Sequence, residues 1–234
     1  MYRKSAVIVT TLTGILMLIS SCTTAPSIAV LESAQTSLYP ITDNSEDWQD
    51  LFALDLSNAV YNAGSWTMEE GILSRQGRGN IWTKEQYGDF ILNLEFKLEE
   101  NTNSGVFIRT GDMRNYVHTA IEIQIHSTTD GTPHGMGGAV YDCLAPTKMM
   151  TKPAGEWNHY TITAKANKIY VVYNGEQVID MDLDLWTEAH LNPDGSRNKF
   201  NTAYKDMPRV GYIGLQDHGQ PIWFRNVKIK RLAL

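Results

Sequence analysis

The chain has 234 residues, 42% of them hydrophobic, and a formal net charge of −6. This length and composition are enough for a sizeable hydrophobic core. A mildly acidic chain without a basic run is a poor candidate for binding nucleic acid or anionic lipid surfaces, so neither is expected as a partner.

Residues 1–21 predict a lipoprotein signal peptide. Two basic residues precede a mostly apolar run over 6–19, which is too short for a confident membrane span of about 20 residues. The following Ile19-Ser20-Ser21-Cys22 resembles the bacterial lipobox, whose cysteine receives lipid; an ordinary cleaved signal is the alternative. We therefore expect a protein exported to the cell envelope and anchored through Cys22, in the outer membrane or periplasm of a Gram-negative bacterium.

Residues 22–47 predict a flexible tether, because they are rich in Thr, Ser, Ala and Pro and lack periodicity. The remaining residues, 48–234, suit one domain. With Cys22 lipidated, Cys143 has no partner for an intrachain disulfide, so stability must come from the hydrophobic core.

Strand patterns dominate this domain. Residues 90–98 alternate strictly between apolar and polar side chains, which indicates a half-buried strand, and residues 105–109 are its expected partner. Residues 160–165, 168–173 and 176–180 predict a three-strand meander, whose second turn is Asn174-Gly175. Residues 211–216 and 222–231 are strand-like, and only residues 195–205 could hold a short helix. The pattern predicts an all-β, antiparallel two-sheet sandwich, with a closed barrel as the alternative.

Residues 120–126 form the most informative strand. Ile121, Ile123 and Ile125 alternate with Glu122, Gln124 and His126, which predicts an apolar back and a polar, chemically capable front. A second polar cluster, Gln216-Asp217-His218, could converge on the first. A solvated sheet face is the alternative interpretation.

An ordered series of phrases resembles the bacterial 3-keto-disaccharide hydrolase domain family, over about residues 48–232. The phrases are Trp82-Thr83, Tyr87 to Phe90, Asn103 to Arg109, Ile121 to Ile125, Gly138 to Tyr141, Lys152 to Asn158, Ile213 to Gly219 and Trp223 to Val227. The resemblance implies a concanavalin-like jelly-roll sandwich, and an enzyme acting on 3-keto-glycosides.

Conventional two-carboxylate hydrolysis is disfavoured. A retaining hydrolase needs two carboxyl groups about 5–5.5 Å apart. On one face of a strand, neighbours lie about 6.6 or 13 Å away, and Glu122 has Gln124 and His126 at those positions. A second acid would have to come from another segment, as Asp142 or Asp217.

A 3-keto sugar needs different chemistry. The ketone acidifies the hydrogen on C2, so proton abstraction can eliminate the oxygen on C1, and water can then add to the enone. This route needs one base and one group that stabilises an enolate. Glu122 or His126 could be the base, Arg109 or His218 could stabilise the oxyanion, and either histidine could protonate the leaving oxygen.

Four further residues are candidate substrate-binding residues: Trp82, Gln124, Tyr141 and Gln216. Some of the polar and aromatic residues have a structural alternative: Trp82 could be core, Arg109 could form an ion pair, and Asp217 could cap a turn. No cofactor is required by the sequence, although a divalent metal held by His126 with His134 or His218 could replace the enolate stabiliser. The competing function is a non-catalytic, lectin-like carbohydrate-binding module.

Overall fold

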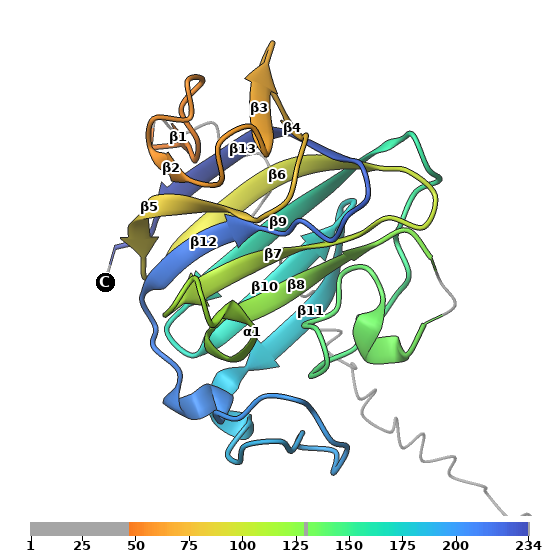
Figure 1. Ribbon diagram of the computed structural model, residues 1–234. Coiled ribbons are helices and arrows are strands. Elements are labelled where there is room, and N and C mark those ends of the chain that lie inside the picture. The colour runs from red at the N-terminus through yellow and green to blue at the C-terminus, as the bar shows by residue number, and fades with distance from the viewer. Residues whose placement is uncertain (1–46, 129–130, 234) are drawn as a thin grey trace, which may run out of the picture. The chain divides into compact units, whose positions relative to one another are not determined.

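The computed structural model describes residues 47–128 and 131–233. These residues form two stacked antiparallel β-sheets (Figure 1). The predicted signal peptide, the lipidation site Cys22 and the tether up to residue 46 lie outside the described residues. Within the described ranges, no helix has the length and apolar character needed to span a membrane.

Strands account for most of the regular structure. The eight-stranded sheet contains β1 (Gln49–Asp50), β3 (Trp66–Glu69), β4 (Ile72–Arg75), β6 (Phe90–Leu98), β9 (Trp157–Lys165), β10 (Lys168–Tyr173), β11 (Glu176–Asp182) and β13 (Ile222–Arg231). The five-stranded sheet contains β2 (Ala59–Val60), β5 (Ile81–Tyr87), β7 (Asn103–Thr110), β8 (Ile121–His126) and β12 (Gly211–Leu215). The helical elements are α1 (Tyr116–Thr119) and the 3-10 turns η1 (Pro133–Gly135), η2 (Leu183–Leu185) and η3 (Tyr204–Asp206).

The order of the strands shows how the chain alternates between sheets. The larger sheet runs β11-β10-β9-β6-β13-β4-β3, with β1 also paired to β13, and the smaller sheet runs β2-β5-β12-β7-β8. The predicted pairing of residues 90–98 with residues 105–109 is wrong, because β6 pairs with β9 and β13 while β7 pairs with β8 and β12. The turn after β6 therefore crosses from one sheet to the other.

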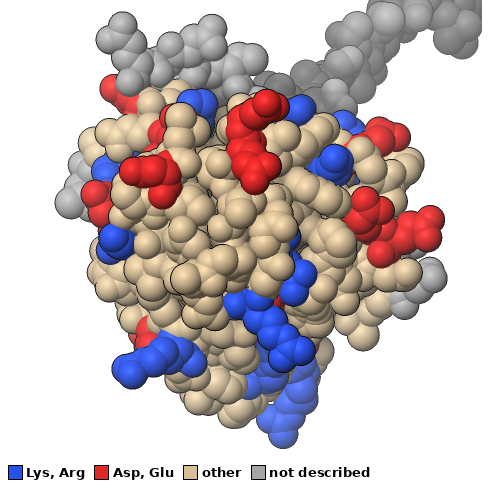
Figure 2. Space-filling view, turned by 45° about the horizontal axis from the view of Figure 1, so that its top comes forward, with Lys and Arg blue, Asp and Glu red and all other residues tan. Residues whose placement is uncertain are grey.

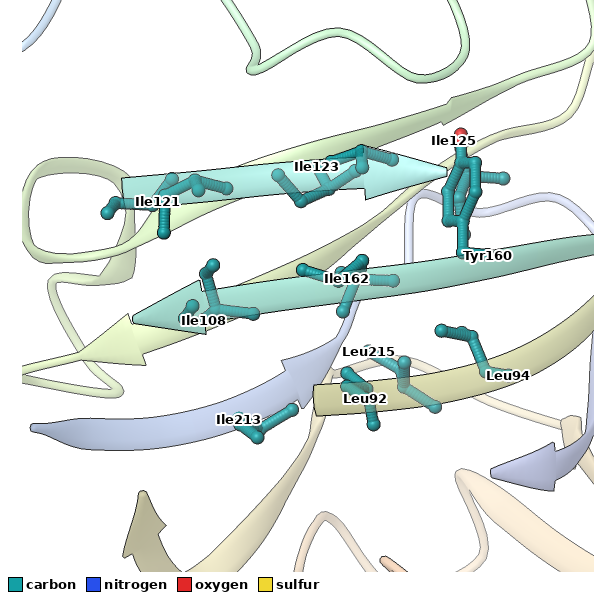
Figure 3. Close-up of a cluster of buried hydrophobic side chains, with 14 of the residues drawn as sticks. Leu92, Leu94, Ile108, Ile121, Ile123, Ile125, Tyr160, Ile162, Ile213 and Leu215 are labelled. Carbon is teal, nitrogen blue, oxygen red and sulfur yellow. The ribbon is translucent and has the colours of Figure 1, made fainter. Parts of the chain in front are cut away.

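The core fills the space between the sheets. Alternate residues of β6 are almost fully buried, as the period-2 pattern predicts, and the isoleucines of β8 face them across the sandwich. Figure 3 shows this packing, with Ile121 and Ile123 of β8 on one side and Leu92 of β6 and Ile162 of β9 on the other. Cys143 is buried and free, and burial raises its pKa to about 12.

Local turn chemistry sets the meander of β9, β10 and β11. Asn174 and Gly175 both have positive φ angles, of 48° and 88°, as a tight hairpin turn requires. Residues 195–205, which could have held a short helix, form a loop in which the 3-10 turn η3 begins at Tyr204. The prediction of an all-β, concanavalin-like jelly-roll sandwich is confirmed.

Charge does not single out a binding surface on the face in Figure 2. Acidic side chains lie mainly in the upper part of that view, with basic side chains among them, and further basic side chains lie in the lower part. The buried polar groups are therefore a better guide to a functional site.

Candidate active site

Glu122 lies on the outer face of the five-stranded sheet, because Ile121 and Ile123 on either side of it point into the core. Its carboxyl group lies across the neighbouring strand β7, above Gly105. A Cβ atom added at Gly105 would be only 2.5 Å from Oε1 of Glu122. A glycine at this position therefore makes room for the carboxyl group.

Neutral amides surround this carboxyl group. Gln216 donates a hydrogen bond from Nε2 to Oε1 of Glu122 over 2.9 Å. The buried Gln124 amide best satisfies its neighbours when its nitrogen faces Oε1 of Glu122, at 3.3 Å. Burial raises the pKa of Glu122 from 4.5 to about 7, although the charge of Lys199 and the hydrogen bond from Gln216 both act in the opposite direction. Glu122 can therefore both accept and release a proton near neutral pH.

The carboxyl group lines a hollow of about 170 Å³, which we call the glutamate cavity. Four of its lining side chains are polar, namely Glu122, Lys199, Gln216 and His218, and the others are Phe107, Tyr116, Val117, Ala120 and Phe200. Clefts for drug-sized ligands measure about 300–1,000 Å³, so this cavity suits one small ring of a substrate.

Gln216 carries an unused hydrogen-bond acceptor in this cavity. Its side chain is buried, and among the described residues its Oε1 atom has no hydrogen-bond partner. Buried polar atoms are almost always paired in native proteins. Nε2 is bonded to Glu122, so the contact that Gln216 makes at this site is the one that holds the carboxyl group.

Lys199 reaches the cavity from a loop that is fastened to the segment after β8. Its backbone N–H donates to Oδ2 of Asp142 over 2.8 Å. Its ammonium group lies 4.2 Å from the centre of the Tyr141 ring, and the backbone N–H of Tyr141 donates to the carbonyl oxygen of Glu122. Tyr141 thus positions Lys199 beside the carboxyl group and is not itself a cavity-lining residue.

Three aromatic rings form one wall. Trp82 stacks on Phe107 with ring centres 5.4 Å apart, and Tyr116 lies 4.9 Å from Phe107 and 5.7 Å from Trp82. Phe107 and Tyr116 face the glutamate cavity, whereas Trp82 and Tyr116 face a second hollow of about 520 Å³. We call this second one the outer hollow. Trp82 therefore adjoins the glutamate cavity without lining it.

The structure does not bring Arg109 to the cavity. In β7, Ile108 and Arg109 together oppose the single residue Ile213 of β12, and Arg109 has a positive φ of 52°, which marks a β-bulge. The bulge breaks the alternation on which the prediction depended. Arg109 instead donates hydrogen bonds to the carbonyl oxygen of Ala166 and to Oδ1 of Asp89, so its role as an oxyanion stabiliser is corrected to a structural ion pair.

His126 is also separate from Glu122. The two residues share a face of β8, but four positions along a strand span about 13 Å. Nδ1 of His126 accepts a hydrogen bond from the backbone N–H of Thr128 over 3.1 Å, and the imidazole does not line the glutamate cavity. His218, and not His126, is therefore the histidine that lines the glutamate cavity with Glu122.

No second acid accompanies Glu122 in the cavity lining. Asp217 accepts hydrogen bonds from Arg75 and from the backbone N–H groups of Gly79 and Gly219, so it caps the turn as its structural alternative predicted. Glu122 and His218 are the only two side chains of the cavity lining of the kinds that bind zinc, and the third charged group is the ammonium of Lys199, so the lining does not supply the three or four ligands of a protein-held zinc site. Within residues 47–128 and 131–233, no three His, Cys, Asp or Glu side chains gather in a metal-binding arrangement.

The structure thus assembles part of the predicted site. It brings together Glu122, Gln124, Gln216 and His218, places Trp82 and Tyr141 next to them, and excludes Arg109 and His126. Sequence reasoning missed Lys199, Tyr116 and Phe200. Lys199 and Phe200 lie in a loop without periodicity, and Tyr116 lies in a one-turn helix. The only local feature that could have indicated a binding role was the adjacent pair of a basic and an aromatic residue at positions 199 and 200.

Comparisons with known proteins cover most of the chain. A family model described as a 3-keto-alpha-glucoside-1,2-lyase-like domain matches residues 47–230. The 3-keto-disaccharide hydrolase of Bacteroides thetaiotaomicron is 24% identical over 204 residues, which cover 71% of this chain and 70% of that protein.

Solved structures with a similar fold are also described as glycosyl hydrolases. A candidate glycosyl hydrolase from Parabacteroides distasonis is 36% identical with a TM-score of 0.76, over 79% of this chain and 99% of that one. Another from the same organism is 22% identical with a TM-score of 0.64, over 80% of this chain and 94% of that one, and shares the fold. Together the similarities support a carbohydrate-active enzyme that cleaves glycosidic bonds.

Proposed function

Because this chain belongs to the 3-keto-alpha-glucoside-1,2-lyase-like domain family, we propose that it cleaves 3-keto-glycosides, including 3-keto-disaccharides, by elimination. The oxidised sugar ring occupies the glutamate cavity, with C2 facing Glu122. The observation that carries this proposal is a single carboxyl group with a pKa of about 7, enclosed without a second acid.

The reaction begins with proton transfer. The carboxylate of Glu122 removes the hydrogen on C2 as a proton. The electron pair of the broken C–H bond forms a C2–C3 double bond, which gives an enolate with its negative charge on the oxygen of C3. The C1–O bond then breaks as the C1–C2 double bond forms, and the leaving oxygen takes a proton. Water adds across the double bond in a later step, so the sum is hydrolysis. One base suffices for this sequence, whereas paired carboxylates would be needed for displacement at C1.

The surrounding residues have matching roles. Lys199 is the cation of the cavity lining, and it stabilises the enolate oxygen in place of the excluded Arg109. His218 protonates the leaving oxygen, since imidazole transfers protons readily near neutral pH. Gln124 and Gln216 hold the Glu122 carboxyl group in place.

A non-catalytic lectin-like module is the competing function. A binding module needs polar groups that hold a sugar, but it has no use for a carboxyl group whose pKa is raised to about 7. The family membership also favours the enzyme.

Incubation of the purified full chain with a 3-keto-disaccharide tests the proposal, with and without added divalent cation. We expect release of the second sugar, and slow or no release from the same disaccharide before oxidation. Saturable binding of the unoxidised disaccharide without release from either form would support the lectin-like module instead.

The cellular location is part of the same proposal. Export and lipid attachment at Cys22 would place this activity in the cell envelope, where oxidised glycosides from outside the cell are met first. Labelling of cells with a clickable palmitate analogue should mark the wild-type chain and not a Cys22→Ala variant. Equal labelling of the two would refute lipidation at Cys22.

A further inference from the structure

The outer hollow lies directly beside the glutamate cavity and shares Tyr116 with it as a common wall. The segment after β12 also runs between the two, since Gln216 and His218 line the glutamate cavity while Asp217 lines the outer hollow. A group that leaves C1 of a sugar in the glutamate cavity, past His218, would therefore enter the outer hollow.

The chemistry of this hollow suits a neutral sugar. Tyr61 and Tyr116 supply partly exposed aromatic rings, and Asn62 and Asn80 supply amides. Trp82, which is only 6% exposed, packs behind Tyr116 and supports this wall. Aromatic rings offer flat apolar surface to the C–H face of a pyranose, and amides can both donate to and accept from hydroxyls. The lining contains one carboxylate and one cation. Asp217 is already bonded to Arg75 and to two backbone N–H groups, and the exposed Arg114 is paired with Asp112 over 3.8 Å.

The walls of the hollow are fixed before any ligand binds. Asp217 ties the segment around Gly79 to the turn after β12, and Nε1 of Trp66 donates to the carbonyl oxygen of Gly79 over 2.8 Å. Trp82 lies flat over Gly214, where an added Cβ atom would meet the indole ring. A preformed aromatic wall loses little conformational freedom when a ligand stacks on it.

We propose that the outer hollow is the subsite for the leaving group, and that this leaving group is a pyranose ring. The inference rests on the proposed function, because it takes the glutamate cavity as the position of the keto sugar. It predicts that the protein acts on 3-keto-disaccharides far better than on 3-keto-glycosides with a small leaving group such as methoxide.

The test is a bulky residue placed in the hollow from its rim. Val60 lines the outer hollow from the edge strand β2 and is 42% exposed, so Val60→Trp should fold and obstruct the subsite. Val210 is similarly exposed, at 53%, and lines neither hollow, so Val210→Trp is the matched control. Both variants are assayed with a 3-keto-disaccharide and with methyl 3-keto-glucoside.

We expect Val60→Trp to lower kcat/KM for the disaccharide by about tenfold or more, mainly through KM, and to leave kcat/KM for the methyl glycoside within about twofold. Val210→Trp should leave both unchanged. Equal effects of Val60→Trp on the two substrates, or no effect on either, would overturn the subsite while leaving the proposed function intact. If the wild-type chain cleaves neither substrate, the proposed function fails and this inference fails with it.

Discussion

Two glutamates occupy comparable positions on the outer faces of the two sheets, and their surroundings shift their pKa values in opposite directions. Glu95 of β6 accepts hydrogen bonds from Arg225 and Asn226, and these outweigh the effect of burial and hold its pKa below the ordinary value. Glu122 of β8 lies against the neutral amides of Gln216 and Gln124, and burial raises its pKa to about 7 even though the charge of Lys199 acts in the opposite direction.

This difference in pKa separates a glutamate with a structural role from one that can take part in a reaction. A carboxylate that accepts two hydrogen bonds from an arginine stays ionised and serves to hold neighbouring strands together. A carboxyl group enclosed beside a cavity, without such a partner, is poised to exchange protons. Apolar and polar residues alternate in the same way in β6 and β8, so the residues on neighbouring strands decide the role of each glutamate.

Removing each carboxylate in turn gives the largest expected effect. Glu122→Gln should lower kcat/KM for a 3-keto-disaccharide by about 10²–10⁴-fold, because the general base is lost while the shape is kept. Glu95→Gln should change it by less than about twofold, since Glu95 bonds to Arg225 and Asn226 on the eight-stranded sheet and does not line the glutamate cavity. Steady-state kinetics of the two purified variants decide the matter; a Glu122→Gln enzyme with wild-type activity would exclude Glu122 as the base.

A smaller change comes from displacing the Glu122 carboxyl group without removing it. Gly105→Ala should lower kcat by about 10–100-fold, because the added methyl group occupies the place of Oε1 and misplaces the base. Gly131→Ala is the control, since nothing lies within 4 Å of a Cβ atom there. Comparable losses of activity in both variants would argue against a position-specific effect.

The pH dependence sharpens the comparison further. If ionised Glu122 is the base, kcat/KM should rise with pH through a midpoint near 7. Lys199→Met should move this midpoint to higher pH, because the positive charge of Lys199 favours the carboxylate. It should also lower the plateau if Lys199 stabilises the enolate. A Lys165→Met control, on the exposed end of β9, should leave the midpoint unchanged; a shift equal to that of Lys199→Met would contradict the assignment.

Stability should respond to pH with opposite sign for the two glutamates. The pKa of Glu122 is about 7 in the folded chain and near 4.5 when unfolded, so the folded state loses stability as pH rises between these values. Thermal melts should therefore show Glu122→Gln more stable than wild type at pH 8, by about 1–3 kcal/mol, with little gain at pH 4.5. Because the pKa of Glu95 is lowered, Glu95→Gln should instead be slightly less stable at pH 8. A Glu122→Gln variant without this gain would indicate an ordinary, solvated carboxyl group.

Local patterns predicted what depends on neighbours in the chain. The alternation of β6, the meander closed by Asn174-Gly175 and the polar front of β8 all follow from rules that act over a few residues. The partition of β6 and β7 between sheets could not be predicted in this way, because pairing is decided by distant strands.

The site shows the same limit. The polar front of β8 was recognisable, but one inserted residue in β7 removed Arg109 from the face that its alternation implied. Lys199 replaced it from a loop, held by a hydrogen bond to Asp142 that spans 57 positions of the sequence. A contact between residues so far apart produces no periodic pattern in the sequence.

The most direct test of the account is the cleavage rate of a 3-keto-disaccharide that carries deuterium at C2 of the oxidised ring, compared with the unlabelled substrate at low conversion. Proton abstraction by Glu122 predicts slower cleavage of the labelled substrate, with a primary isotope effect on kcat/KM. Equal rates for the two, with C2 deuterium retained in the released keto sugar, would contradict elimination and indicate direct attack at C1.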